Sequence, residues 1–513
     1  MRRTAAVLVA ALLGGAVPPP GGATAPGGTS SAPAGPIDAD SRAWWDFTRA
    51  LSNDAMAGRE AGSPGYERAA RLVAARMAAA GLKPLGDNGT WYQRVPLHEI
   101  AVPRATLAGP GGTLQFLSEF TVAPNPSLPA RLTLPIAYRG YCAAENLGEV
   151  RGKLVVCHGT HRADLPSGAQ REAAVRAGGG AGIATIADPG FAVEPPRWPF
   201  AYARDVAIAG QEPGPDPFVR LTLNAAALSK LLPSSTAAEL IAAGAAGRPL
   251  PAIDGGSAAL SFAVTQRALS SPNVIGVLPG TDPAKADQAI VLGAHLDGYG
   301  FGSEVAGDRL YNGTLDDAAY VALIVRLAEK RHGRGFARPV IFAAWTGEEK
   351  GLLGSKWFVT HPTRALTRIA ANINLDQLRP IFPLKLLTVH ARTDSTLGVD
   401  AAAVAAARGI AVQDDPEPER NLVRRTDHWN FMRAGIPGVN FVFGYAPGSA
   451  SEQVYRQWYR TGYHKPQDDE HQPMDWQAAA NFNRFFYALV ARVADQPAAP
   501  AWAANSTLRG SGH

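Results

Sequence analysis

Residues 346–355 read TGEEKGLLGS and place two adjacent carboxylates, Glu348 and Glu349, directly after the apolar run at residues 339–345. Such an apolar run is typical of a buried strand. Side chains alternate along an extended segment, so the two glutamates can point to different sides of one site at the strand's end. One could bind a metal while the other moves a proton. Taken alone, the pair could equally open a helix in solvent, because the helix dipole favours acidic residues there.

Strand and helix patterns alternate from residue 271 onward. The predicted strands are residues 274–278, 289–294, 340–345, 369–375, 385–390 and 439–443, and the predicted helices are residues 318–331 and 399–407. This alternation indicates an α/β domain, an α/β/α sandwich in which helices cover both faces of a mixed, mostly parallel sheet. In such sheets, ligands collect at the loops that follow the carboxyl ends of the strands.

Each strongly polar cluster of this domain follows one of those strands or opens the next element. The clusters are His295 with Asp297, Asp316 with Asp317, Glu348 with Glu349, Asp376, and His464 with Asp468 and Asp469. Two imidazoles and several carboxylates at one sheet edge would be costly to bury unless cations neutralise them. Nitrogen and oxygen ligands without thiolate suit zinc, with manganese or cobalt as alternatives. One aspartate alone could be a helix N-cap, but the whole set points to a metal site.

The motifs that carry these residues resemble those of one family of metallopeptidases. They are Gly-Ala-His-Leu-Asp at 293–297, Leu-Asp-Asp-Ala at 315–318, Gly-Glu-Glu-Lys-Gly-Leu-Leu-Gly-Ser at 347–355, Asn-Leu-Asp at 374–376, Thr-Asp-His at 426–428 and Tyr-His at 463–464. In this order they resemble the dizinc aminopeptidase and glutamate carboxypeptidase family, which also holds glutaminyl cyclase and the transferrin receptor. The resemblance spans residues 271–492 and implies a zinc-exopeptidase type of fold.

The resemblance implies a role for each matching residue. It implies two Zn²⁺ ions per chain, held by His295, Asp316, Glu349, Asp376 and His464. Asp316 would bridge the ions, Glu349 and His464 would share one ion, and His295 and Asp376 would share the other. Glu348 would be the general base that takes a proton from the attacking water and later returns it to the leaving amine.

Four further residues lie in or beside these motifs. Asp297 would orient His295 by contacting its ring. Tyr463 is a candidate oxyanion donor, with simple packing as the alternative. Arg425 matches a substrate-contacting position of some relatives, but a surface arginine in a loop fits the sequence equally well. His428 is interpreted as lining the pocket or supporting a ligand, and not as a ligand itself.

The remaining segments give predicted domain borders. Two arginines, an apolar run and small residues predict an export signal at residues 1–25, followed by a disordered linker at residues 26–38. Residues 39–127 are assigned to the N-terminal part of the peptidase domain, residues 265–495 to its catalytic part, and residues 496–513 to a flexible tail. Residues 128–264 are a predicted β-rich insert that resembles a protease-associated domain through Gly-Lys-Leu-Val-Val at 152–156.

Composition limits the compartment and the partners. Lys and Arg number 49 against 44 Asp and Glu, and a net charge of +5 without a long basic run gives nucleic acid and anionic membranes little support as partners. No apolar run is long enough to span a membrane as an ordinary helix. We therefore expect an exported protein, secreted or periplasmic, and leave the oligomeric state open. Cys142 and Cys157 could form a disulfide or remain buried thiols.

The leading hypothesis is an exported zinc aminopeptidase that removes N-terminal residues from peptides. A carboxypeptidase is the first alternative, because Arg424 and Arg425 could bind a substrate carboxylate. A glutaminyl cyclase would use a single zinc, whereas the intact set of five ligands favours two. A non-catalytic binding protein should have lost ligands or Glu348, and none of them is missing here.

Overall fold

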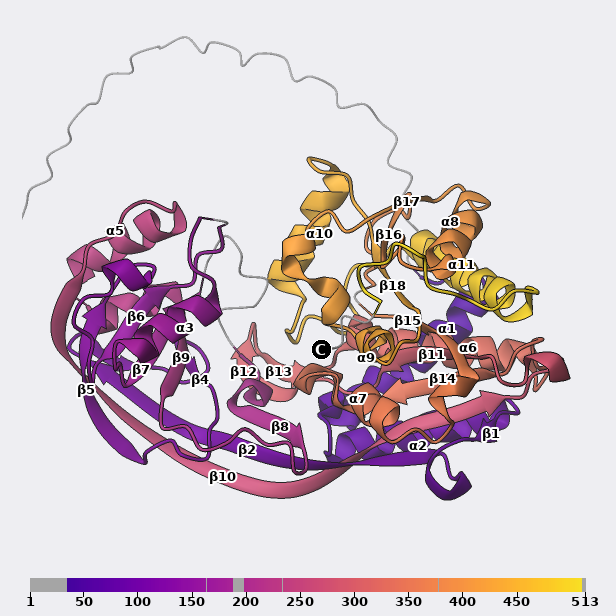
Figure 1. Cartoon of the computed structure of the whole chain (residues 1–513), viewed down its shortest axis with the longest axis horizontal. Helices are drawn as coiled ribbons and strands as arrows, with labels where there is room; N and C mark the ends of the chain where they lie inside the picture. Colours follow the sequence, from indigo (N-terminus) through magenta and orange to yellow (C-terminus); the bar gives the residue numbers. More distant parts are fainter. Residues whose placement is uncertain (1–34, 163, 188–197, 233, 377, 510–513) are drawn as a thin grey trace, which may run out of the picture.

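Two long strands connect the two lobes of the molecule (Figure 1). The computed structural model describes residues 35–162, 164–187, 198–232, 234–376 and 378–509, so the predicted export signal and most of the predicted linker lie outside the described residues. The connecting strands, β2 (Tyr92–Gly109) and β10 (Ile253–Leu278), pair antiparallel from Tyr92 to Ala108. Because both run from one lobe into the other, a single sheet, with 16 strands among the described residues, continues through the molecule.

The larger lobe contains the predicted mixed, mostly parallel sheet. Its strands follow the order β17–β16–β18–β15–β11–β14–β10. They are β11 (Ala289–His295), β14 (Val340–Trp345), β15 (Ile369–Asn374), β16 (Leu386–His390), β17 (Ala411–Gln413) and β18 (Gly438–Phe443). The central strands β14, β11, β15 and β18 are parallel, whereas β10 and β16 run antiparallel to their neighbours β14 and β18. The predicted fold class is confirmed.

Helices cover both faces of this sheet. The helices α1 (Ala39–Ser52), α2 (Pro64–Ala79), α6 (Ala319–Arg331), α8 (Thr396–Ala406) and α11 (Trp476–Asp495) contribute to the core on one face, and α7 (Leu353–Thr360) and α9 (His428–Arg433) to the core on the other. Side chains alternate between the two cores, since Ile290 and Leu292 face the first and Val291 faces the second. Burial on both faces explains why these strands read as continuous apolar runs.

The second lobe is an α/β structure built on the outer halves of β2 and β10. It contains β3 (Gly112–Leu114), β4 (Phe120–Val122), β5 (Arg131–Tyr138), β6 (Leu154–His158), β7 (Gly182–Ile186), β9 (Val219–Leu223), α3 (Gly168–Ala177), α4 (Leu228–Leu231) and α5 (Ser234–Ala245). The strands β5, β6, β7 and β9 are parallel neighbours. Helices therefore accompany the strands that were predicted as a β-rich insert. The resemblance of this lobe to a protease-associated domain stays a prediction.

The predicted border at residue 128 lies inside the second lobe and is therefore wrong. Val102, Leu107 and Phe120 belong to the same hydrophobic core as Leu134 and Val156. The lobe thus begins within β2. Since β2 passes from one core to the next as one unbroken strand, no loop or change of composition marks the border in the sequence.

The segment from residue 497 to residue 509, predicted as a flexible tail, contacts the larger lobe. The indole N–H of Trp502 donates to the carbonyl of Gly435 at 2.8 Å, and the hydroxyl of Ser506 donates to Asp394 at 2.7 Å. The backbones of Ser395 and Trp502 also form a β-bridge. Single polar contacts hold this segment on the larger lobe, and such contacts leave no periodic pattern from which they could be predicted.

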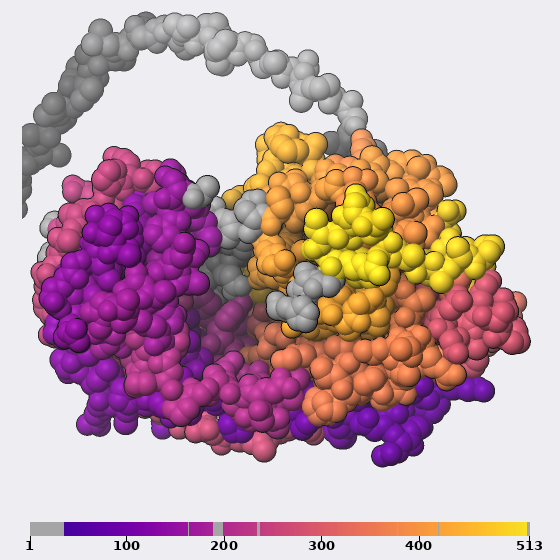
Figure 2. All heavy atoms as spheres, viewed as in Figure 1, coloured from indigo at the N-terminus to yellow at the C-terminus, as the bar shows by residue number. Residues whose placement is uncertain are grey.

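The remaining elements lie near the junction of the lobes or at the edges of the larger lobe. They are β1 (Lys83–Pro84), β8 (Arg204–Ile208), β12 (Gly300–Val305), β13 (Asp308–Tyr311) and α10 (Ala450–Thr461). The molecular surface is hollowed between the two lobes, as Figure 2 shows. Among the described residues, no helix has both the length and the apolar character that crossing a membrane requires.

Cys142 and Cys157 form a disulfide within the second lobe, which decides between the two states that the sequence left open. The bond joins the loop after β5 to strand β6 across a sequence separation of 15 residues. A loop of this length restricts the unfolded chain and stabilises the folded state by about 3 kcal/mol.

We expect the double variant Cys142→Ala/Cys157→Ala to unfold at a lower temperature than the oxidised wild type, with a loss of about 3 kcal/mol in the free energy of unfolding. Thermal and urea unfolding of both proteins would measure this loss. Reduced wild type is the matched control and should resemble the variant. Equal stability of the oxidised wild type and the variant would contradict the prediction.

Candidate metal centre and active site

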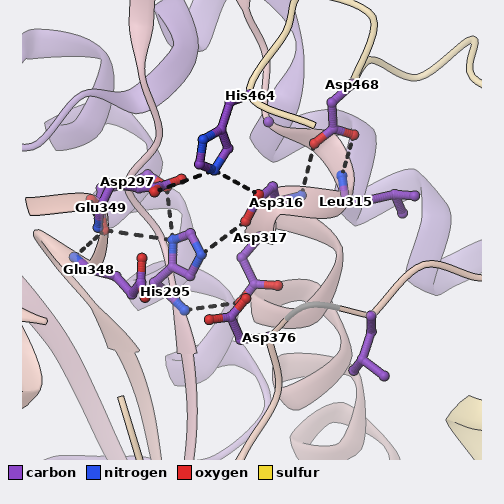
Figure 3. Close-up of polar contacts among 12 residues, drawn as sticks. His295, Asp297, Leu315, Asp316, Asp317, Glu348, Glu349, Asp376, His464 and Asp468 are labelled. Atoms are coloured by element: carbon purple, nitrogen blue, oxygen red, sulfur yellow. Dashed lines mark hydrogen bonds and ion pairs between the residues drawn. The ribbon is translucent and has the colours of Figure 1, made fainter. Parts of the chain in front are cut away.

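The carboxyl ends of three adjacent parallel strands bring four of the predicted residues together (Figure 3). His295 is the last residue of β11, which lies between β14 and β15. Glu348 and Glu349 follow the end of β14, and Asp376 follows the end of β15. Strand order alone therefore places these side chains at one edge of the sheet.

Asp316 reaches the same point from a turn that opens α6. The carboxylate of Asp468 supports this turn, because its two oxygens accept the backbone N–H groups of Leu315 at 2.9 Å and Asp316 at 3.0 Å. The backbone carbonyl of Asp468 also accepts the N–H of Thr314 at 3.0 Å. His464, which follows α10, comes from the same loop as Asp468. One loop thus carries His464 and fixes the turn that carries Asp316.

Asp316 lies between the two imidazoles and turns one oxygen toward each of them (Figure 3). Its Oδ1 is 3.3 Å from His295 Nε2, and its Oδ2 is 3.6 Å from His464 Nε2. Glu349 Oε2 lies 3.8 Å from the same nitrogen of His464. The guanidinium of Arg379 also donates to Asp316 Oδ2 at 3.1 Å. A carboxylate that bridges two metal ions would need this arrangement.

The potential ligand atoms fall into three overlapping groups, each with all atoms within 4.8 Å of one another. The groups are Asp316, Glu349 and His464; His295, Asp317 and Asp376; and His295, Glu348 and Glu349. All five residues that were predicted to bind metal belong to these groups. The structure brings them together, while their role as ligands stays a prediction.

Asp317 is a member of this cluster that was not included among the predicted site residues. Its Oδ2 accepts the backbone N–H of His295 at 3.1 Å. Its Oδ1 is buried and has no hydrogen-bond partner among the described residues. The side chain is directed to the cluster because it neighbours Asp316 in the turn, and this adjacency was the signal available in the sequence.

Burial of like charges shifts the pKa values across the cluster. Burial raises the pKa of Glu348 and of Asp317 well above their ordinary values and raises that of Glu349 to about 7. Burial would also raise the pKa of Asp316, but the Arg379 guanidinium and the imidazoles outweigh it and lower that pKa. A bound cation favours the deprotonated form of nearby carboxyl groups, so it would lower these raised pKa values.

Asp297 contacts His295 and also supports the adjacent glutamates. His295 Nδ1 lies 3.1 Å from the backbone carbonyl oxygen of Asp297 and 3.8 Å from its carboxylate. The same carboxylate accepts the backbone N–H groups of Glu348 at 3.1 Å and Glu349 at 3.3 Å. Asp297 therefore orients both the imidazole and the turn that carries the glutamate pair.

The other three predicted residues, Tyr463, Arg425 and His428, differ in how deeply they are buried. The ring of Tyr463 stacks on that of His464 with 3.6 Å between centroids, and burial raises the pKa of its phenol. Arg425 is exposed. His428 is fully buried, with Nδ1 2.6 Å from the hydroxyl of Thr426, and burial lowers its pKa to about 3. His428 is not part of any potential ligand group among the described residues.

Two tyrosines that were not among the predicted site residues contact the cluster. The hydroxyl of Tyr299 donates to Glu349 Oε2 and lies 3.2 Å from His464 Nε2. The hydroxyl of Tyr202 lies 2.7 Å from the other nitrogen of that ring, Nδ1, and the two tyrosine rings stack on each other. Tyr299 follows Asp297 by two residues, which was a weak signal, whereas no local motif marks Tyr202.

The donor set fits zinc. Imidazole nitrogens and carboxylate oxygens converge without thiolate, and zinc accepts both ligand types. Oδ1 of Asp317 and Oε1 of Glu349 are buried without a hydrogen-bond partner among the described residues, although buried polar atoms are nearly always bonded. A cation at this centre would satisfy both atoms.

Comparison with known proteins finds a family model that matches most of the larger lobe. Residues 273–490 match the model of peptidase family M28. The chain is 28% identical over 179 residues to a probable zinc metalloprotease of Pyrenophora teres f. teres, covering 33% of this chain and 38% of that protein. It is 26% identical over 243 residues to leupeptin-inactivating enzyme 1 of Streptomyces exfoliatus, covering 46% and 51%. The match thus spans between 38% and 51% of the length of these relatives.

Solved structures resemble the chain over nearly its whole length. An aminopeptidase from Aneurinibacillus sp. strain AM-1 superposes with a TM-score of 0.58 at 19% identity, covering 89% of this chain and 94% of that one. A zinc aminopeptidase from Bacillus subtilis gives a TM-score of 0.59 at 17% identity, covering 90% and 96%. These similarities show a shared fold.

The raised pKa values predict how the stability of the metal-free protein depends on pH. Burial raises the pKa of Glu349 and Asp427 to about 7 and that of Asp468 to about 6. The folded state then holds more protons than the unfolded state, so the free energy of unfolding falls as pH rises through these values. His428, whose pKa burial lowers to about 3, acts in the opposite direction below the ordinary histidine pKa of about 6.5. We therefore expect the melting temperature of chelator-treated protein to fall between about pH 6.5 and about pH 8.

Asp427→Asn provides a matched variant, because it removes one carboxyl group with a raised pKa and leaves every predicted ligand in place. Its melting temperature should fall less over the same interval. Stabilisation by added zinc should instead grow with pH, because zinc requires deprotonated ligands. A metal-free melting temperature that stays level or rises with pH would contradict this account of the cluster.

Proposed function

We propose that the chain is a zinc-dependent aminopeptidase that removes N-terminal residues from peptides, because residues 273–490 match the model of peptidase family M28. The observation that carries this proposal is the position of Asp316, which turns one carboxylate oxygen toward His295 and the other toward His464. An aminopeptidase and a zinc aminopeptidase from other organisms share the fold and support the proposal.

We assign the zinc-holding residues from this geometry and from the resemblance. Two ions would be held by His295, Asp316, Glu349, Asp376 and His464, with Asp316 between them. The group Asp316, Glu349 and His464 supports one site, and the contact group that joins His295 with Asp376 supports the other. When bound, zinc polarises the scissile carbonyl and lowers the pKa of a water molecule.

Glu348 is assigned as the residue that moves the proton. Its carboxylate lies within 4.8 Å of the ligand atoms of His295 and Glu349, and the residue is half-buried. Burial raises its pKa, which suits a group that accepts a proton from water and returns it to the leaving amine. Tyr463 and Tyr299 are candidates for contacting the developing oxyanion.

Cleavage at the N-terminus is favoured by the charge of the site. A free α-amino group is a cation, and the centre has more carboxylates than cations. A carboxypeptidase would need arginines directed at a substrate carboxylate. Arg424 and Arg425 are both exposed, and Arg424 lies over the ring of Trp429 at 5.1 Å from its centroid.

We also propose that the protein acts outside the cytoplasm, secreted or periplasmic. The sequence pattern at residues 1–25 is typical of an export signal. The disulfide between Cys142 and Cys157 adds support, because such bonds persist mainly in oxidising compartments.

Hydrolysis of peptides with free, blocked or acidic ends tests the proposal. The wild type should release N-terminal residues only from unblocked peptides and should contain about two zinc ions per chain. Glu348→Gln should retain zinc and lose about 10²- to 10⁴-fold in kcat, because proton transfer typically contributes that much. Glu145→Gln, at an exposed position of the second lobe, is the matched control and should behave as the wild type.

Other outcomes would assign a different function. Release of C-terminal residues from N-blocked peptides would establish a carboxypeptidase. Cyclisation of N-terminal glutamine with a single zinc would establish a glutaminyl cyclase. Tight zinc binding without turnover of any peptide would point to a binding protein.

A further inference from the structure

Residues 198–208 leave the second lobe and reach the candidate metal centre of the larger lobe. They lie on the connection from β7 to β9 and include the helical turn Phe200–Ala203 and strand β8. β8 pairs with β2 near the junction of the lobes, between Leu97 and Ala101. We call this stretch the bridging segment.

Three contacts anchor the bridging segment on the larger lobe. The ammonium of Lys350, which follows the glutamate pair, donates to the carbonyls of Ala201 at 2.6 Å and Arg204 at 2.9 Å. Arg204 also forms an ion pair with Glu60. These contacts hold the backbone on both sides of Tyr202 and leave its side chain directed at the centre.

Tyr202 contacts the nitrogen of His464 that is turned away from the proposed zinc ions. His464 Nε2 faces Asp316 and Glu349, at 3.6 Å and 3.8 Å, whereas Nδ1 lies 2.7 Å from the hydroxyl of Tyr202. Metal-binding histidines generally donate their second N–H to an oxygen, which fixes the tautomer and the orientation of the ring. The phenol oxygen of Tyr202 occupies that acceptor position.

We propose that Tyr202 is a positioning residue for His464, so that a side chain of the bridging segment completes a zinc site of the larger lobe. The inference rests on the proposed zinc centre. When Tyr202 accepts the proton of Nδ1, the lone pair of Nε2 is directed toward Asp316 and Glu349. Removal of the phenol oxygen allows the other tautomer and a rotated ring, and both weaken the ligand.

Linkage makes this dependence reciprocal. If docking of the bridging segment favours zinc binding, then zinc binding favours docking of the segment by the same free energy. Zinc should therefore slow hydrogen exchange of the backbone amides in β8. Loss of the Tyr202 hydroxyl should remove that slowing while the rest of the fold stays unchanged.

Zinc affinity measured by competition with a chromophoric chelator tests the inference. In Tyr202→Phe, the ion held by Glu349 and His464 should bind about 10- to 100-fold more weakly, and the ion held by His295 and Asp376 should keep its affinity. Tyr141→Phe is the matched control, since its hydroxyl donates to the backbone carbonyl of Arg248 within the second lobe at 2.9 Å, away from the centre. This control should bind both ions as the wild type does.

A second variant keeps the test decisive if Tyr202→Phe fails to fold. Glu60→Gln weakens the anchor at Arg204 without altering Tyr202 or a predicted ligand, and it should give a smaller loss at the same zinc ion. A folded Tyr202→Phe protein that binds both ions with wild-type affinity would overturn the inference alone. A wild type that binds no zinc would overturn the proposed function, so the two failures are distinguishable.

Discussion

Like charges buried at the carboxyl ends of β11, β14 and β15 are the constraint on which the rest of the structure depends. An unpaired buried charge costs several kcal/mol, and carboxylates outnumber cations here. Two buried arginines offset part of the excess: Arg379 donates to Asp316, and Arg59 donates to the backbone carbonyls of Leu296 and Gly313 on either side of the centre. The remaining negative charge favours the binding of cations at the carboxyl ends of these strands.

Rigidity of the centre comes from carboxylates outside the predicted ligand set. Asp297 accepts the amides of the glutamate turn, and Asp468 accepts those of the turn that carries Asp316. Turns held in this way keep their side chains in place as strands do, which a site for catalysis requires. The left-handed backbone at Gly58 lets the chain pass close to Gly300, since a Cβ there would lie 2.7 Å from the Cα of Gly300.

The features that could be predicted from the sequence are those that depend on a local residue pattern. Apolar runs such as residues 340–345 located the strands, and polar residues directly after them located His295 and the glutamate pair. The role of Asp468 and the contact of Tyr202 were not predicted, because Tyr202 and His464 are separated by 262 residues and meet only through the docking of the lobes. The border within β2 and the course of the chain after residue 496 were missed for a related reason: continuous strands and single hydrogen bonds leave no periodic signal.

The sharing of β2 and β10 between the lobes limits how such proteins can be recombined. A domain joined by loops can be cut out or exchanged at those loops, but here a cut must pass through two paired strands. The register of the pair shifts between Ala263 and Thr265, opposite the stretch from Ala101 to Arg104. A bulge already interrupts the ladder at that point. In a chimera that exchanges the second lobe, the new strands are best joined at this bulge, because the join disturbs the fewest hydrogen bonds there.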